Sequence, residues 1–255
     1  MTRPSGSQAI DRAATLLMRV VDASGSVTFS ELAASTGLAK STTSRILSAL
    51  ERNGLLRREP GGAFSPGDAF VKYALRGNAE TDLVAVAMVY LEQLGELSHE
   101  TINLGVVRNG MVEQIAQVDS RFVLGGTNWL GRSVPMHCTA LGKVFLAFHA
   151  ASLPGGRLER LTPKTITVRA ALEEELVTVR ERGYAVTDEE LETGLTAIAA
   201  PVRRHDGVVV AAVSVTGPTT RFSPSRISEV AAQCVSQADA LSSVLGYLQR
   251  KEGVT

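Results

Sequence analysis

Residues 37–50 read GLAKSTTSRILSAL, and this stretch constrains the fold more than any other part of the chain. A helix that starts around Ser30, with that serine as its N-cap, is expected to stop at Gly37, because glycine tolerates the left-handed conformation common just past a helix end. A second helix is expected over residues 39–53. Two helices joined by a short glycine-containing turn form the helix-turn-helix unit, whose second helix enters the major groove of DNA.

The helix expected over residues 39–53 has two contrasting faces. At about 100° per residue, one face carries Thr43, Ile46, Leu47 and Leu50. The opposite face carries Ser41, Arg45, Ser48 and Arg52, which are short and hydrogen-bonding or cationic, as a groove-facing surface requires. A predicted hairpin around the sequence EPGG adds two arginines as a wing. The predicted DNA-contacting residues are Lys40, Ser41, Thr42, Thr43, Arg45, Ser48, Arg52, Arg57 and Arg58.

The alternative for this region is a three-helix bundle with a solvated polar face. The distribution of charge favours DNA binding. Residues 1–77 contain ten Lys/Arg and six Asp/Glu, whereas residues 78–255 contain sixteen and twenty, although the formal net charge of the chain is zero. Only the basic N-terminal part is therefore expected to meet a polyanion.

The rest of the chain predicts a mixed α+β domain. An Asn109-Gly110 turn between TINLGVV and MVEQIAQV indicates a β-hairpin, and residues 195–202 and 208–215 indicate a second one. Helices are expected over residues 8–23, 68–75, 83–97, 139–148 with Thr139 as cap, 170–182, and from Ser223-Pro224 onward. The segment RGNAETD, residues 76–82, is the predicted domain boundary.

Enzyme classes with a recognisable motif are not indicated. The chain has no G-x-S-x-G elbow, no P-loop and no dinucleotide-binding glycine fingerprint. His137 and Cys138 are neighbours, and in extended backbone they would point to opposite faces, which argues against a nucleophile–base pair. His149 and Cys234 add no metal-ligand spacing. We therefore expect no catalytic residues, no metal and no cofactor.

The cysteine content and the hydropathy of the chain indicate its cellular compartment. Two cysteines nearly a hundred positions apart form no disulfide framework and suit a reducing environment. No apolar run approaches the length of about 18 residues that a membrane helix needs. A cytoplasmic protein without a membrane partner is expected.

Small residues suggest a pocket in the second domain. Val210, Ala212, Ser214 and Thr216 share one strand face, and small side chains also alternate on the neighbouring strand. Such strands leave volume, and hydroxyls at its edge can orient a polar ligand group. The first turn of the TALGK helix can direct N–H groups at a carboxylate there. A tightly packed core with incidental Ser and Thr is the alternative, and the residues alone do not decide between the two.

The segment ELAASTGLAKSTTSRILSALERNGLL resembles the winged helix-turn-helix of the IclR family of bacterial transcriptional regulators. Five further segments resemble that family's effector-binding domain: ETINLGVV, VPMHCTALGKVFLAF, LTPKTIT, RERGYAVTDEELETGLTAIAAPV and AAVSVTGPTTRFS. The resemblance therefore covers about Gln8 to Leu248. It implies an α+β chain with a winged helix-turn-helix domain at residues 6–67, a linker helix and boundary at 68–80, and a GAF-like effector-binding and oligomerisation domain at 81–250.

By position, the family's ligand pocket maps onto Val134, Ala140, Leu141, Thr187, Asp188, Ala197, Ser214 and Thr216, and nearby Trp129 is added to this set. The chain departs from some members in having threonine rather than an acid at 187 and alanine rather than cysteine at 197. These departures imply a less polar or larger ligand than a two- or three-carbon acid.

The expected function is that of a ligand-responsive transcriptional regulator, repressor or activator, of genes of small-molecule metabolism. Its partners would be double-stranded operator DNA, a small organic or aromatic acid or related metabolite, and further copies of itself as a dimer or dimer of dimers. The helices at 68–75 and 83–97 are the expected dimer contacts, through an apolar stripe of Val84, Val86, Tyr90 and Leu91. The alternatives are an enzyme with an appended nucleic-acid-binding domain and a ligand-independent architectural DNA-binding protein.

Overall fold

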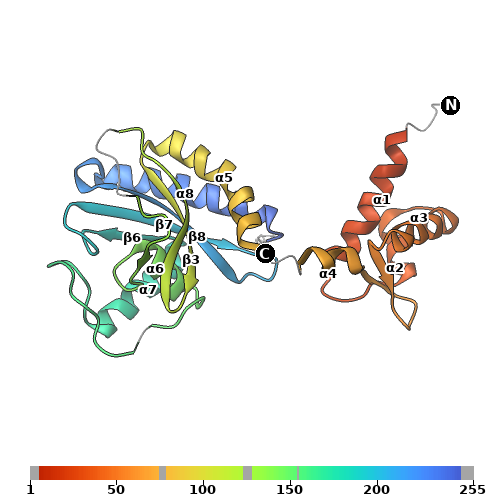
Figure 1. Ribbon diagram of the computed structural model, residues 1–255, viewed down its shortest axis with the longest axis horizontal. Coiled ribbons are helices and arrows are strands. Elements are labelled where there is room, and N and C mark those ends of the chain that lie inside the picture. The colour runs from red at the N-terminus through yellow and green to blue at the C-terminus, as the bar shows by residue number, and fades with distance from the viewer. Residues whose placement is uncertain (1–5, 75–78, 123–127, 154, 248–255) are drawn as a thin grey trace, which may run out of the picture. The chain divides into compact units, whose positions relative to one another are not determined.

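The computed structural model describes residues 6–74, 79–122, 128–153 and 155–247 (Figure 1). The chain divides into two compact units, Met1–Ala79 and Glu80–Thr255, and each is described by itself. The helix that was expected to open the linker, Asp68–Ala74, belongs to the first unit. Residues 75–78 of the expected boundary lie outside the described residues.

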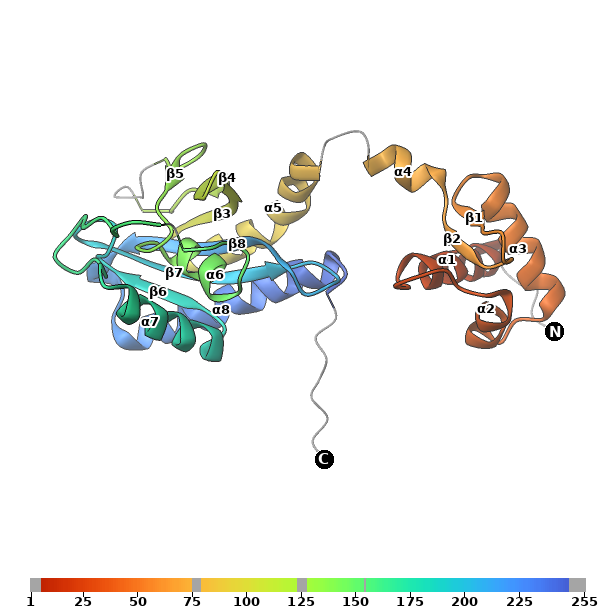
Figure 2. The same ribbon diagram turned by 90° about the horizontal axis from the view of Figure 1, so that it is seen from below.

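The first unit is a small helical domain with a β-hairpin. Its core is formed by leucines of all three N-terminal helices together with Phe64 of the hairpin. Strands β1 and β2 pair antiparallel, as Figure 2 shows beside the helices of this unit. The elements are α1 (Gly6–Val21), α2 (Phe29–Thr36), α3 (Lys40–Arg52), β1 (Leu56–Arg58), β2 (Phe64–Pro66) and α4 (Asp68–Ala74).

Helix α2 begins two residues earlier than expected, because its N-cap is Thr28 and not Ser30. The Thr28 hydroxyl accepts a hydrogen bond from the Glu31 N–H at 3.3 Å, and the Glu31 carboxylate accepts one from the Thr28 N–H at 2.8 Å. This is a capping box, which satisfies two N–H groups at once. The backbone hydrogen bond from Thr28 lowers the pKa of Glu31. At the other end Gly37 has a φ of 62°, which confirms the expected left-handed C-cap.

The second unit is built on a six-stranded antiparallel sheet with the order β5-β4-β3-β8-β7-β6. Both predicted hairpins are confirmed, and Asn109 and Gly110 have positive φ as the tight turn requires. The short strands β5 and β6 were not anticipated. The elements are α5 (Ala79–Ser98), β3 (Thr101–Arg108), β4 (Met111–Val118), β5 (Ser133–Val134), α6 (Ala140–Ala147), α7 (Arg169–Arg182), β6 (Ala185–Asp188), β7 (Leu195–Arg203), β8 (Val209–Pro218) and α8 (Pro224–Val244).

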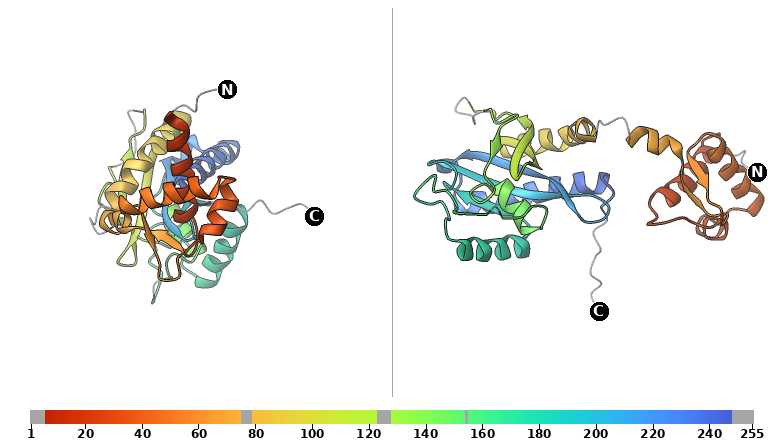
Figure 3. Two further views of the ribbon diagram at one scale, coloured as in Figure 1. Left: turned by 90° about the vertical axis from the view of Figure 1, so that its right-hand side faces the viewer. Right: turned by 60° about the horizontal axis from the view of Figure 1, so that its bottom comes forward.

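Helices cover both faces of this sheet (Figures 1 and 3). Helices α5 and α8 pack on one face through an apolar cluster that includes Leu91, Ile102 and Val215. Helices α6 and α7 form a second cluster on the other face, around Phe145 and Leu172. Because side chains alternate along a strand, each strand of β7 and β8 supplies both clusters.

Helix α6 makes two close contacts with its surroundings at glycines. A methyl group added at Gly142 would overlap the backbone of Met136, and one added at Gly105 of β3 would lie 3.0 Å from the Leu141 side chain. Gly142 therefore allows the turn before α6 to fold back against the helix, and Gly105 allows Leu141 of α6 to approach the sheet. Thr139 caps this helix as expected, with its hydroxyl accepting from the Gly142 N–H at 3.2 Å.

None of the helices in the described ranges is both long enough and apolar enough to cross a membrane.

Candidate functional site

The outward face of α3 in the first unit carries exposed polar and basic side chains. Lys40, Ser41, Arg45 and Arg52 are exposed, and Thr42 and Ser48 are half-buried. Arg45 and Arg52 line a groove between α1 and α3 together with Arg12 of α1. Among the described residues these three arginines have no ion-pair partner, so their charge is available to an external anion.

Two residues of α3 differ from the sequence-based expectation. Thr43 is fully buried, and its hydroxyl donates to the Ala39 carbonyl at 3.3 Å, so its side chain does not face DNA. Its position beside Leu47 and Leu50 on the helix, which the periodicity had indicated, accounts for this. Ser44 is exposed and was missed, although the same count of about 100° per residue places it beside Ser41 and Ser48.

The wing arginines are each held by an acid of the same unit. Arg57 lies 2.9 Å from the Glu59 carboxylate, and Arg58 lies 3.8 Å from Glu51 and stacks over the Phe64 ring at 4.8 Å. About half of each arginine side chain stays exposed, 55% and 49% respectively. Binding a phosphate would therefore require these arginines to share or exchange their acidic partners.

The second unit contains a cavity between the first turn of α6 and the sheet. Its empty volume is about 430 Å³, of which the centre of a water-sized sphere can reach about 40 Å³. The larger figure includes open solvent, so the smaller one describes the enclosed space and shows that the site is tight. It is lined by Asn103, Gln114, Trp129, Val134, Thr139, Ala140, Leu141, Thr187, Leu191, Leu195, Ala197, Ser214 and Thr216.

The cavity brings together all of the residues predicted for the effector site except Asp188. Thr187 of β6 faces the cavity, and the next side chain on a strand points to the other face. Asp188 is accordingly exposed, and its carboxylate accepts from Lys164 at 2.7 Å and from Thr196 at 3.2 Å. Of the loop at 119–134 expected to flank the site, residues 123–127 lie outside the described residues.

Sequence reasoning missed Asn103, Gln114 and Leu191 as lining residues, and assigned Thr139 only a capping role. In the sheet, Asn103 of β3 pairs with Ser214 of β8, and Gly105 pairs with Gln114 of β4. A bulge after Leu104 shifts the register of β4 so that Gln114 joins this face. The polar residues within the apolar strands TINLGVV and MVEQIAQV were the sequence feature that could have identified Asn103 and Gln114.

Two amide oxygens in the cavity are buried and have no hydrogen-bond donor among the residues that the structure describes. The Asn103 Oδ1 and Gln114 Oε1 atoms are shielded from solvent and accept no hydrogen bond from the protein. Leaving such a group unpaired costs about 1–3 kcal/mol of stability. Above the sheet, the Gly142 N–H of α6 is capped by Thr139, whereas the Ala140 and Leu141 N–H groups have no acceptor among the described residues, so this end of the cavity favours negative charge.

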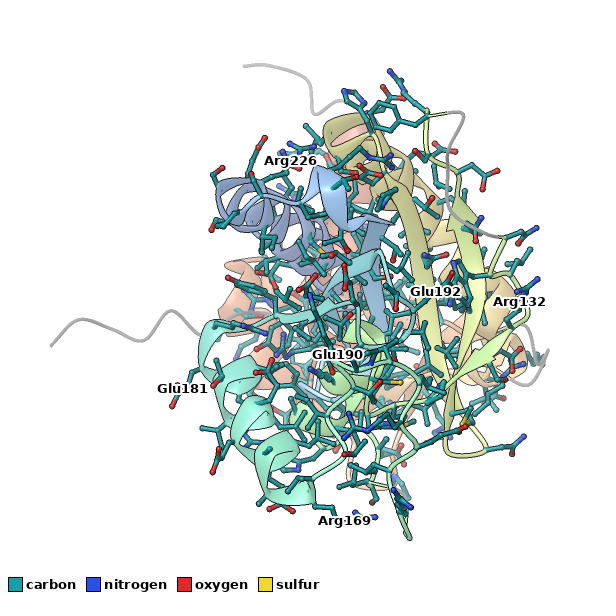
Figure 4. All side chains as sticks on the ribbon, turned by 90° about the vertical axis from the view of Figure 1, so that its left-hand side faces the viewer. Arg132, Arg169, Glu181, Glu190, Glu192 and Arg226 are labelled. Atoms are coloured by element: carbon teal, nitrogen blue, oxygen red, sulfur yellow. The ribbon has the colours of Figure 1, made fainter. Side chains whose placement is uncertain are left out.

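No charged side chain lines the cavity, but a buried ion pair lies directly behind its wall. Lys143 Nζ of α6 donates to Glu190 Oε1 at 2.5 Å, and the two side chains are 1% and 9% exposed. Figure 4 shows Glu190 among the interior side chains, whereas Glu181 projects from the outer side of α7. Leu191 follows Glu190 in the chain and lines the cavity. The ion pair of Lys143 and Glu190 therefore holds the cavity wall at Leu191 against α6.

The neighbouring groups complete a buried polar cluster. Thr165 donates to the Glu190 carbonyl at 2.7 Å, and Glu175 of α7 lies 4.0 Å from the lysine ammonium. Burial raises the pKa of Glu190, and the opposing effect of Lys143 does not offset it. The carboxylate is therefore costly to ionise here and depends on its lysine partner.

The His137-Cys138 pair shows no catalytic geometry. The backbone at 136–139 forms a turn and not the extended strand assumed from the sequence. His137 Nε2 lies 2.9 Å from the Glu159 carbonyl, and burial raises the pKa of Cys138 to about 12, so the thiol stays protonated. No group of three or more potential metal ligands occurs among the residues that the structure describes.

Two family models match this chain. The model described as "IclR helix-turn-helix domain" matches residues 9–60, and the model "Bacterial transcriptional regulator IclR C-terminal" matches residues 78–243.

Similar proteins have the same two parts. The chain is 34% identical to the HTH-type transcriptional regulator KdgR of Escherichia coli, over 85% of each chain. It is 36% identical to the glycerol operon regulatory protein of Streptomyces griseus, over 85% of this chain and 87% of that one. The crystal structure of the Agrobacterium tumefaciens repressor BlcR is similar with a TM-score of 0.74 and 26% identity, covering 96% of this chain and 99% of that one.

The buried ion pair gives a test of how the cavity wall is held. Lys143→Met should lower the free energy of unfolding by about 3–5 kcal/mol at neutral pH, because it leaves Glu190 buried without its cation. The double variant Lys143→Met/Glu190→Gln should recover most of this loss. Denaturant unfolding followed by fluorescence of Trp129, the only tryptophan of the chain, measures both.

The pH dependence has a defined sign. The folded-state pKa of Glu190 is already raised above 4.5, and removing the lysine raises it further. The stability deficit of Lys143→Met should therefore be smallest near pH 4.5 and grow as pH rises. As the matched control, Lys164→Met breaks the half-exposed pair with Asp188 and should cost only about 0–1 kcal/mol. Equal losses in Lys143→Met and Lys164→Met would contradict the assignment.

Proposed function

Since this chain belongs to the IclR family of bacterial transcriptional regulators, we propose that α3 and the wing bind double-stranded operator DNA and that the cavity of the second unit holds the effector. The chain is a ligand-responsive DNA-binding regulator, and its relatives are regulators and not enzymes. The observation that carries the DNA proposal is the outward face of α3, where Arg45 and Arg52 have no acidic partner.

In this proposal α3 lies in the major groove with its hydroxyl-bearing face against the bases. Ser41, Ser44 and Ser48 are small enough for the backbone to approach the duplex closely. Arg45 is long enough to bind a guanine edge with two hydrogen bonds or to bind a phosphate. Arg57 and Arg58 of the wing reach the adjacent phosphate backbone, with half of each side chain already exposed.

We propose that the effector is a small organic acid. The first turn of α6 offers N–H groups to a carboxylate, and Trp129, Leu191 and Leu195 offer apolar contact. The names of two relatives, the glycerol operon regulatory protein and the acetate operon repressor, refer to operons of small-molecule metabolism. We extend this to the genes that the present chain controls.

A ligand alters DNA affinity only as far as it binds the DNA-bound and free conformations differently. The cavity offers such a difference because its walls come from α6, from the sheet and from the segment at 187–195. A ligand that draws these parts together changes their spacing. Whether this change releases DNA or strengthens its binding is set by the geometry of the two operator-bound units.

A homo-oligomer is proposed on geometric grounds, because one winged unit makes few contacts and operators of such proteins are pseudo-palindromic. The expected contact stripe needs one correction. Leu91 is fully buried in the core, and Val84 and Tyr90 are half-buried against it. Val86 is exposed as expected, and the other large apolar side chains that are exposed are Val71 and Tyr73 of α4 and Val89 and Leu97 of α5.

The first prediction concerns DNA affinity. Arg45→Ala should weaken operator binding by on the order of 1–3 kcal/mol, because it removes a base-edge or phosphate contact. Fluorescence anisotropy with DNA from the upstream region of the gene measures this, and affinity should also fall as salt rises. Arg157→Ala, an exposed arginine of the second unit, is the control. Unchanged affinity in Arg45→Ala would remove this residue from the DNA contacts.

The second prediction concerns assembly. Sedimentation at micromolar concentration should show a dimer or a dimer of dimers, since the exposed apolar side chains of α5 in the second unit otherwise stay in water. Val89→Glu should shift the equilibrium toward monomer, whereas Val208→Glu, on an exposed turn between β7 and β8, should not. A parent protein that is monomeric and protects a single half-site on DNA would contradict the proposal.

The third prediction concerns the effector response. Ser214→Leu should abolish it, because leucine fills part of the cavity and removes a hydroxyl at its floor. Folding and ligand-free operator binding should persist, with an overpacking cost of up to about 1–3 kcal/mol. Operator binding is measured with and without the effector. A well-folded Ser214→Leu protein with a full response would place the effector elsewhere.

A further inference from the structure

We propose that Asn103 and Gln114 form a subsite for hydroxyl groups, so that the effector is a hydroxylated carboxylic acid and not a plain aliphatic or aromatic one. This inference rests on the proposed effector role of the cavity and narrows the class of its ligand. Neither residue was assigned to the site by its motif. Both are buried, and their amide oxygens have no hydrogen-bond donor among the described residues.

The two amides are directed into the cavity and not into the packed core. Asn103 and Gln114 are 2% and 5% exposed, line the cavity, and have oxygen atoms without a hydrogen-bond donor. Buried polar groups in native proteins are nearly always paired. Gln233 and Gln237 of α8 also have unpaired oxygens, but they lie outside the cavity. A ligand is the partner that the cavity can supply.

The sheet places the two amides next to the hydroxyls that were predicted from the sequence. Asn103 pairs across β3 and β8 with Ser214, and Ser214 is followed on the same face by Thr216. Gln114 pairs with Gly105, which has no side chain and lies two residues from Asn103 on the same face of β3. The floor of the cavity is therefore a continuous row of hydrogen-bonding groups that crosses three strands.

The chemistry of these groups selects hydroxyls. A hydroxyl both donates and accepts, so it can pair with an amide in either orientation of its terminal atoms. A carboxylate cannot donate to an amide oxygen, and an ammonium group would find no anionic side chain among the lining residues. We therefore place the carboxylate at the first turn of α6 and the hydroxyls on the sheet. An aliphatic acid or benzoate would leave both amides unpaired.

The test uses compact, polar probes because the reachable space is small, in contrast to the larger or less polar ligand that Thr187 and Ala197 implied. Glycerate and erythronate are the hydroxylated acids, propionate and butyrate are their deoxygenated counterparts, and glycerol lacks the carboxylate. Each is titrated into the full chain, with calorimetry and the fluorescence of Trp129 as readouts. At least one hydroxylated acid should bind about tenfold or more tightly than its deoxygenated counterpart and than glycerol, as one or two added hydrogen bonds predict.

The variants separate recognition from structure. Asn103→Leu and Gln114→Leu should lose the preference for hydroxylated acids. Because each removes an unpaired buried group, the ligand-free melting temperature should stay level or rise. Gln117→Leu on the same strand is the matched control. Its amide is already satisfied by the Trp129 N–H at 2.8 Å and by Asp119, so its loss should lower the melting temperature.

Several results would overturn the subsite. These are equal affinity for hydroxylated and deoxygenated acids, no binding by either hydroxylated acid at millimolar concentration, or a lowered ligand-free melting temperature in both Asn103→Leu and Gln114→Leu. Operator binding measured in the same titrations keeps the two proposals apart. Hydroxylated acids that bind without changing operator affinity support the subsite and refute the effector role. Propionate or benzoate that alone changes operator affinity supports the effector role and overturns the subsite.

Discussion

The close approach of helix α6 to the sheet is the constraint on which the second unit depends. Gly142 removes the side chain that would overlap Met136, and Gly105 leaves room for Leu141. The helix is then fixed by the pair of Lys143 and Glu190, two groups that are unfavourable to bury singly. Because the first turn of α6 is held in place, the N–H groups of that turn have fixed positions on one side of the cavity.

The cavity exists because small side chains line the face of the sheet that lies opposite the first turn of α6. Ala197 and Ser214 leave space that larger residues would fill, and the walls at Trp129 and Leu191 close it. The unit gives up packing and leaves Asn103 and Gln114 unpaired, both of which reduce stability. A folded core has no need of these features, whereas a site that is stabilised by its ligand does.

The first unit follows a different rule, since its functional face has no packing role. Leu47 and Leu50 of α3 are buried with Leu16 and Val20 of α1, which leaves the opposite side of the helix free of structural demands. Serines and unpaired arginines can occupy that side without cost to the core. The wing differs, because Arg57 and Arg58 already have acidic partners that they would have to exchange in the proposed contact with DNA.

The sequence by itself determined what depends on neighbours a few positions apart. It determined the helix-turn-helix, the caps at Gly37, Thr139 and Ser223, and both long hairpins, because periodicity and turn chemistry act locally. It also indicated the small residues of β8. It did not show that the Asp188 side chain lies outside the cavity.

Only the tertiary structure decided which face of each strand meets α6. That choice pairs Asn103 with Ser214, directs Thr187 inward and Asp188 outward, and joins Lys143 to Glu190. These partners lie far apart in the chain. Burial on one side of a sheet is set by what packs there, and no local pattern specifies this.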